Sequence, residues 1–152
     1  YMYNYSGQPW KAQHWIREVM DKLYTPAPDG YCGDEDNGQT SAWYVFSAMG
    51  FYPVCPGTDE YVLGTPYFKE MKLHLENGKT VTISAPNNGD DKRYISSMKL
   101  NGKEYTKTYL THQDLLNGAS ISFKMEAKPN QQRGTKEVAF PYSFSNEFKK
   151  KK

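Results

Sequence analysis

The segment Gly33–Gly50, GDEDNGQTSAWYVFSAMG, is the part of the sequence that best defines the fold. Its first half places three carboxylates in a row, Asp34, Glu35 and Asp36, between two glycines. Its second half, Ala42–Met49, is apolar nearly all round, which is typical of a helix buried on every side. The free N–H groups and dipole of a helix N-terminus favour negative charge. The acids are therefore expected at the start of this helix.

The acidic segment has two interpretations at this point. Asp36 or Asn37 caps the helix, or an ionised carboxylate acts as a general base or binds a cation. A calcium-binding EF-hand loop is excluded, because Val45 stands at its twelfth position, where a Glu is needed. No G-x-S-x-G elbow is present. The three histidines lack a recognisable partner pattern for a nucleophilic triad; they are His14, His74 and His112.

A second helix is expected before the acidic segment. Proline suits a first helical position, so the helix is expected to begin at Pro9. Apolar residues then recur at helical spacing from Trp15 to Leu23, and TPAPDG at residues 25–30 ends the helix. Two helices of this kind cannot bury each other, which indicates that they belong to a larger helical assembly.

From about residue 58 the pattern changes to the alternation of half-buried strands. Strands are expected around residues 71–75, 81–85, 94–100 and 121–125. The turns Asn77-Gly78 and Asn101-Gly102 predict two hairpins. Residues beyond about 130 lack a strong period and are expected to run over the surface.

Composition excludes several classes of protein. The net charge is +2, but Lys149–Lys152 supplies four positive charges, so the rest of the chain carries −2 and this run is interpreted as a solvated tail. The sequence has no basic stripe interleaved with aromatic residues, so nucleic-acid binding is not predicted. It has no apolar stretch near 18 residues, so a membrane span is not predicted either. Cys32 and Cys55 are too few for a disulfide scaffold; they either pair with each other or remain free thiols.

Several motifs, taken in order, closely resemble the C-terminal part of glycoside hydrolase family 92. The resemblance covers roughly residues 1–134. It is carried by residues 3–11 (YNYSGQPWK), 33–39 (GDEDNGQ), 41–53 (SAWYVFSAMGFYP), 61–66 (YVLGTP), 100–102 (LNG) and 129–130 (PN). Members of this family are calcium-dependent, exo-acting, inverting α-mannosidases that pair an N-terminal β-sandwich with an (α/α)6 barrel.

The resemblance implies a role for each candidate site residue. Asp36 corresponds to the general base, and Asp34 assists it. Gln39 is a candidate for substrate binding or for capping the helix, and Trp10 is a candidate for lining the sugar site. Glu35 is expected to point away into a structural contact. Ca²⁺ would bind the 2- and 3-hydroxyls of the sugar, through ligands that the sequence does not identify.

The fold class expected from the resemblance is α+β. Residues 1–57 would be the last helices of the (α/α)6 barrel, residues 58–134 a small antiparallel β region with hairpins, and residues 135–152 a tail. The family's general acid is a glutamate upstream of these residues, so the rest of the same polypeptide is expected to be a partner. Mannose-containing glycans are the expected substrates, and a periplasmic or extracellular location is implied. The alternative is a non-catalytic carbohydrate-binding or interaction module built on the hairpins.

Overall fold

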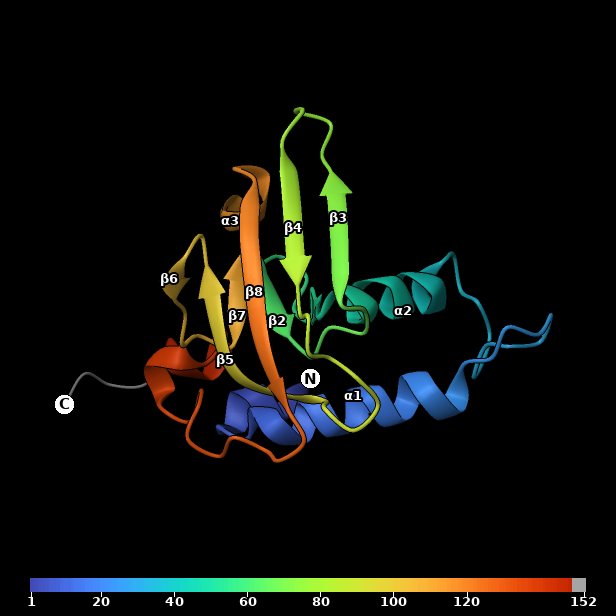
Figure 1. Ribbon diagram of the computed structural model, residues 1–152, viewed down its shortest axis with the longest axis horizontal. Coiled ribbons are helices and arrows are strands. Elements are labelled where there is room, and N and C mark those ends of the chain that lie inside the picture. Colours follow the sequence, from blue (N-terminus) through green and yellow to red (C-terminus); the bar gives the residue numbers. More distant parts are fainter. Residues whose placement is uncertain (149–152) are drawn as a thin grey trace.

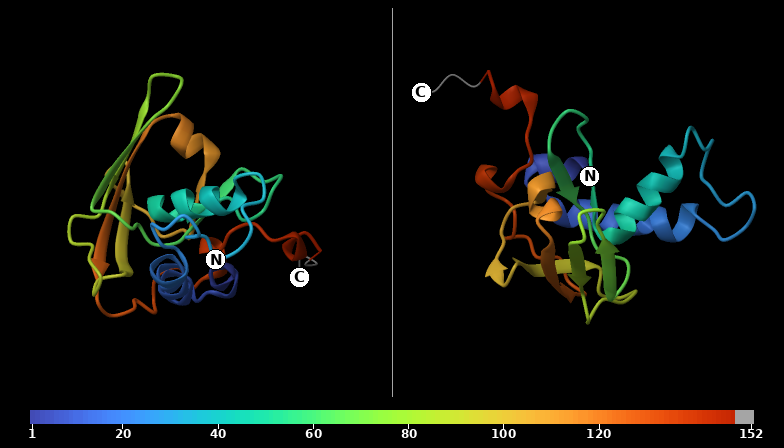
Figure 2. Two further views of the ribbon diagram at one scale, coloured as in Figure 1. Left: turned by 90° about the vertical axis from the view of Figure 1, so that its right-hand side faces the viewer. Right: turned by 90° about the horizontal axis from the view of Figure 1, so that it is seen from above.

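The computed structural model describes residues 1–148, so the predicted Lys149–Lys152 tail lies outside the described residues. In Figure 1, helix α1 (Pro9–Leu23) lies along the lower side and a sheet stands above it. The loop between α1 and helix α2 (Gln39–Met49) projects from one end of the molecule, and Figure 2 shows the same projection from above. No helix in this described part is long and apolar enough to cross a membrane.

The two predicted helices are confirmed. Pro9 is the first residue of α1. Gly50 follows α2 with a φ of 97°, a left-handed conformation that suits glycine, and its N–H bonds to the carbonyls of Phe46 and Ser47. The remaining helical segments are short: η1 (Met2–Ser6), α3 (His112–Leu116), η2 (Glu137–Ala139) and η3 (Phe144–Asn146).

The strands form two sheets. The five-stranded sheet has the order β3-β4-β8-β5-β6, with β3 at Glu70–His74, β4 at Thr80–Ser84, β5 at Tyr94–Leu100, β6 at Lys103–Glu104 and β8 at Ala119–Glu126. The three-stranded sheet has the order β1-β2-β7, with β1 at Phe51–Tyr52, β2 at Glu60–Leu63 and β7 at Tyr109–Thr111. Both predicted hairpins are present, β3–β4 and β5–β6.

The expectation of a purely antiparallel β region is wrong in one respect. Strand β8 lies between β4 and β5, and it pairs with β4 in parallel, with Ile83 opposite Ile121. The chain between these strands is long enough for the crossover that parallel pairing requires. Helix α3 within this region was also not expected. It begins with a capping box, in which the Thr111 hydroxyl accepts from the Asp114 N–H and the Asp114 carboxylate accepts from the Thr111 N–H.

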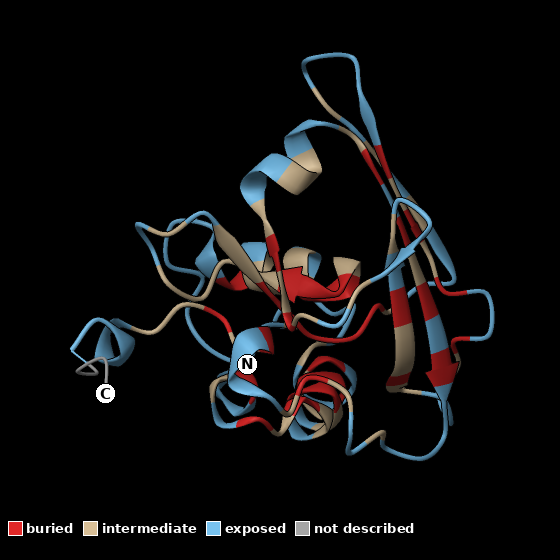
Figure 3. Ribbon diagram, turned by 90° about the vertical axis from the view of Figure 1, so that its left-hand side faces the viewer, coloured by how far each residue is buried: buried red, intermediate tan, exposed pale blue. Residues whose placement is uncertain are grey.

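Helix α2 is not buried on every side in this chain, contrary to the prediction. Its buried residues are Thr40, Ser47 and Ala48, whereas Val45 is 56 % exposed. The reason is that the described residues cover α2 in part: it packs against α1, β1 and β2, and against Tyr24 and Tyr67, and Val45 lies outside these contacts. In Figure 3 the buried residues gather on the inward sides of α1 and of the sheets.

Buried polar contacts attach α1 to the β strands. The Gln13 side-chain oxygen accepts the Ile95 N–H of β5 at 3.0 Å. The Arg17 guanidinium donates to the Pro66 carbonyl at 2.9 Å, and its charge lies over the Tyr67 ring, 4.5 Å from the centroid. These contacts fix the helix that leads into the acidic segment. The expected domain boundaries at residues 57 and 134 stay predictions.

The prediction for residues beyond 130 is only partly right. Most side chains there are exposed, but Ala139 is buried and its carbonyl accepts from both the N–H and the hydroxyl of Thr108. The Arg133 guanidinium reaches inward and donates to the carbonyls of Tyr105 and Lys107, each at 3.0 Å.

Candidate active site

The three acids lie directly before the first turn of α2, as predicted, and all three are exposed. Of the two interpretations of this segment, capping of the helix by Asp36 or Asn37 is wrong, because Gly38 is the N-cap residue and neither side chain bonds to the helix. Asn37 and Gly38 have φ angles of 54° and 83°. These left-handed conformations turn the chain so tightly that the Asp36 carbonyl accepts the Gln39 N–H, at 3.0 Å.

Glu35 is the acid that satisfies the helix N-terminus. Its carboxylate accepts a hydrogen bond from the Ser41 N–H, at 3.0 Å, and another from the Ser41 hydroxyl. Hydrogen bonds from Ser41 lower the pKa of Glu35 from its ordinary value. The expectation that Glu35 points into a structural contact is thus confirmed.

The carboxylates of Asp34 and Asp36 do not bond to the N-terminus of α2. The contact that fixes Asp34 involves its backbone, whose carbonyl accepts the Thr40 hydroxyl at 3.1 Å. Within residues 1–148, no side chain donates a hydrogen bond to either carboxylate. Both carboxylates are therefore free of contacts with the described residues.

The other predicted site residues lie in different places. Gln39 is the first residue of α2, exposed and next to the acids. Trp10 is the second residue of α1, and at 1.5 Å per residue it lies about 20 Å along the helix from Leu23, where the connection to the acids begins. The structure therefore brings Gln39 to the acids and does not bring Trp10 to them.

An aromatic hollow of about 360 Å³ lies beside the acidic segment. Its lining residues are Tyr24, Thr25, Pro26, Tyr31, Ser41, Tyr44 and Val45. The Tyr31 hydroxyl lies 3.0 Å from the Ser41 hydroxyl, the same group that contacts Glu35. Tyr31 was not predicted as a site residue. In the sequence its one signal is its position four residues before Glu35, which only the folded loop makes interpretable.

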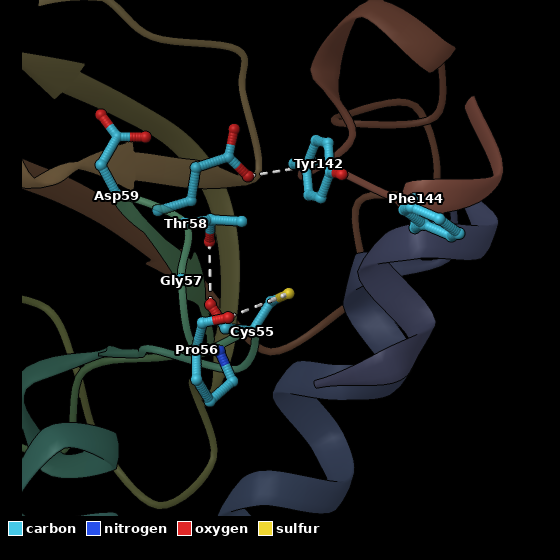
Figure 4. Close-up of a pocket in the computed structure, with 8 residues that line it drawn as sticks. Cys55, Pro56, Gly57, Thr58, Asp59, Tyr142 and Phe144 are labelled. Atoms are coloured by element: carbon cyan, nitrogen blue, oxygen red, sulfur yellow. Dashed lines mark hydrogen bonds between the residues drawn. The ribbon is translucent and has the colours of Figure 1, made fainter. Parts of the chain in front are cut away.

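A larger hollow, of about 660 Å³, lies elsewhere, between residues 55–60 and the C-terminal segment (Figure 4). In Figure 4, Tyr142 and Phe144 lie on the side of the hollow opposite Pro56 and Asp59. The Glu60 carboxylate accepts the Tyr142 N–H at 2.6 Å, and burial raises the pKa of Glu60. None of the predicted site residues lines this hollow.

The structure also bears on metal binding and on the two thiols. In residues 1–148 no three His, Cys, Asp or Glu side chains gather in a way that could hold a metal ion. Cys32 is exposed, Cys55 is half-buried, and both are free thiols.

Comparison with known proteins identifies the family. The sequence profile of the glycosyl hydrolase family 92 catalytic domain matches residues 1–127. The chain belongs to glycosyl hydrolase family 92. This assignment to a catalytic domain favours the glycosidase interpretation over a free-standing binding module.

Solved structures of the family superpose closely on this chain. It is 59 % identical to a family GH92 inverting mannosidase of Bacteroides thetaiotaomicron, with a TM-score of 0.90, covering 95 % of this chain and 20 % of that one. It is 40 % identical to a GH92 α-mannosidase of the same organism, solved in complex with mannoimidazole, with a TM-score of 0.91, covering 95 % of this chain and 19 % of that one. These solved family members are about five times longer than the matched part.

A curated relative gives a more distant match. This is an uncharacterised secreted glycosidase of Arthroderma benhamiae, 29 % identical over 128 residues, which are 82 % of this chain and 16 % of that protein. The family 92 chain described here therefore spans about a fifth or less of each of these relatives.

Proposed function

We propose that this chain is the C-terminal part of the catalytic region of an exo-acting, inverting α-mannosidase. Asp36 is its general base and Asp34 assists. Family membership supports the reaction class, and both solved relatives are named as mannosidases. The observation that carries the residue assignment is the position of Asp34 and Asp36, exposed at the N-terminus of α2 and spared from capping by Glu35.

The proposed step is a single displacement at the anomeric carbon of a terminal mannose. Asp36 takes a proton from water while the water oxygen bonds to the anomeric carbon from the face opposite the leaving group. The bond to the leaving oxygen breaks, and that oxygen receives a proton from an acid on the other side of the sugar. In an inverting enzyme the two carboxyl groups stand about 6.5–9.5 Å apart, which leaves room for the water.

The acid in this scheme is a glutamate from the rest of the longer polypeptide. We propose that the same part of the polypeptide also packs against α1 and α2. The exposed apolar side chains of these helices support this partner. Trp15 and Leu23 of α1 are 53 % and 50 % exposed, and Val45 of α2 is 56 % exposed. Side chains of this size are usually covered when they fall on one face of a helix.

Calcium dependence and location belong to the same proposal. Calcium is a hard cation that would bind sugar hydroxyls. Its ligands in the longer protein are not identified, because no group of three His, Cys, Asp or Glu side chains gathers among residues 1–148. Removal of calcium with a chelator from the longer protein, followed by an activity assay, tests this dependence. The proposed location is periplasmic or extracellular, and the secreted relative supports it.

The decisive experiment is Asp36→Asn in the longer polypeptide that contains this chain. An amide cannot take the proton from water, so kcat on an α-mannoside should fall by about 10²–10⁴-fold. The matched control is Asp29→Asn, which removes an exposed carboxylate from the same loop and should leave kcat unchanged. Circular dichroism and thermal melting should show both variants folded like the wild type.

Two further readouts sharpen the assignment. NMR of the first product should show the β-anomer of mannose, because inversion converts an α-linkage into a β-hemiacetal. In Asp36→Ala, azide needs no base to attack, so added azide should restore turnover and yield a β-mannosyl azide. Wild-type kcat in a folded Asp36→Asn protein would remove Asp36 from the base role, and α-mannose as first product would contradict inversion.

A further inference from the structure

We propose that Thr40 is a positioning residue for the general base. Its hydroxyl holds the backbone of the acidic segment, and with it the direction of the Asp34 and Asp36 carboxylates. The inference rests on the proposed function, because a positioning role has meaning only if these carboxylates act on the attacking water. Thr40 itself touches neither the water nor the sugar in this scheme.

The acidic segment is attached to the first turn of α2 through its backbone. The Asp34 carbonyl accepts the Thr40 hydroxyl at 3.1 Å, and the Asp36 carbonyl accepts the Gln39 N–H at 3.0 Å. Because a peptide unit is planar, a hydrogen bond to its carbonyl restricts the orientation of the Cα atoms at both ends. The two aspartates are therefore held in place without a contact to either carboxylate.

Few other contacts hold this segment. Residues 31–35 make no backbone–backbone hydrogen bond within residues 1–148. A Cβ atom placed on Gly33 would have no described atom within 4 Å apart from those of its chain neighbours. A second side-chain bond joins the Glu35 carboxylate to the Ser41 N–H, also in the first turn of α2. The location of the segment therefore depends on side-chain bonds to this turn.

Thr40 is well suited to hold such a bond. It is 8 % exposed, so water competes little for its hydroxyl. A β-branched side chain has few rotamers in a helix, which also limits the direction of the hydroxyl. The Thr40 carbonyl accepts the Tyr24 hydroxyl at 3.4 Å, and Tyr24 is the C-cap residue of α1. Thr40 thus joins the end of α1, the start of α2 and the acidic segment at one point.

The expected effect of Thr40 follows from the chemistry of a general base. The base must lie within about 2.6–3.2 Å of the water that it deprotonates, and a displacement of about 1 Å can lower a rate by about 10²-fold. Without the Thr40 hydroxyl, the Asp34 carbonyl loses its partner and the segment is free to shift. The loss should appear in kcat and not in KM, because neither Thr40 nor the Asp34 carbonyl contacts the sugar in the proposed scheme.

The test is Thr40→Val in the longer polypeptide, which removes the hydroxyl and keeps the branched shape. We expect kcat on an α-mannoside to fall by about 10–100-fold, with KM within about twofold of the wild type. Thr40→Ser keeps the hydroxyl and should stay within about threefold of the wild-type kcat. Thr40→Cys, whose S–H is a weak donor, should show the same fall if Thr40→Val does not fold.

The matched control is Thr108→Val. Thr108 is 0 % exposed, and its hydroxyl donates to the Ala139 carbonyl at 2.7 Å, a bond that joins two other parts of the chain. Loss of this bond should lower the melting temperature and leave kcat unchanged. The control therefore separates an effect on the acidic segment from the general effect of losing a buried hydroxyl.

A double-mutant cycle with Asp36→Asn distinguishes positioning from a purely structural role. If Thr40 acts through the base, Thr40→Val should lower kcat by less than about threefold once Asp36 is replaced. A further loss as large as in the wild-type background would overturn the inference. So would a rise in KM alone, an equal loss in Thr40→Ser, or a loss of kcat shared with Thr108→Val. Full activity of Asp36→Asn would refute the proposed base, whereas a weakly active Asp36→Asn beside a fully active Thr40→Val would refute the positioning role alone.

Discussion

Gln13 offers a sharp test of how α1, and with it the acidic segment, is attached to the sheet. The side chain is 4 % exposed and its oxygen accepts the N–H of Ile95, which is itself 1 % exposed. The backbone of Met125, opposite Ile95, bonds to the Asn87 side chain on the other side of β8. Strand β6 pairs only with Lys99 and Leu100 of β5. No strand of the sheet accepts the Ile95 N–H in the described residues, and the Gln13 side chain accepts it instead.

Gln13→Met keeps the length of the side chain and removes the acceptor. A buried N–H without a partner costs about 1–3 kcal/mol, partly offset by burial of the methionine. We expect the free energy of unfolding to fall by about 1–2 kcal/mol. The melting temperature of a chain of this size should fall by about 2–8 °C.

The assay is urea and thermal unfolding, followed by circular dichroism. The matched control is Gln113→Met, since Gln113 is exposed and its side-chain amide, among residues 1–148, bonds only to the Asn117 side chain. A surface change of this kind should stay within about 0.5 kcal/mol of the wild type. Hydrogen exchange adds a local readout, because the Ile95 amide should lose protection in Gln13→Met alone. Equal stability of the two variants, with Ile95 still protected, would refute the reasoning.

Two further predictions concern charge and exposed surface. Ion pairs with Lys22 and Arg93 lower the pKa of Glu18 from 4.5 to about 2, so its contribution to stability is present above pH 4.5 and is lost as pH falls toward 2. Acid unfolding of Glu18→Gln should therefore depend less steeply on pH in this window, and an unchanged slope would contradict the pairing. Separately, the exposed Trp15 and Leu23 should make the isolated chain self-associate, which light scattering would detect as a mass above that of the monomer. Replacing both by Lys should reduce the association, whereas a monodisperse wild-type monomer would argue against an uncovered apolar face.

Local patterns of the sequence predicted the local structure well. The start of α1 at Pro9, the end of α2 at Gly50 and the two Asn-Gly hairpins each depend on a few neighbouring residues. The parallel pairing of β4 with β8 was not predictable in the same way. It joins strands far apart in the chain, and alternation of apolar residues is the same for parallel and antiparallel neighbours.

The candidate site was predicted in position but not in detail. The three acids were expected before α2, and they lie there. Which acid contacts the helix depends on the left-handed turn at Asn37 and Gly38, a conformation that the sequence allowed without requiring. The Tyr31 hollow depends on how the loop after α1 folds back on α2, and no periodic pattern describes that loop.

The three acids of the acidic segment differ in their contacts with the fold. One carboxylate is enough to satisfy the free N–H groups at the start of α2, and Glu35 does this through Ser41. Asp34 and Asp36 add two like charges beside it, without a donor or a cation partner among residues 1–148. Neither side chain makes a hydrogen bond or an ion pair that holds the described part of the fold together. We infer that they act on a bound molecule, and in a family 92 chain the water that attacks the glycosidic bond is the molecule we propose.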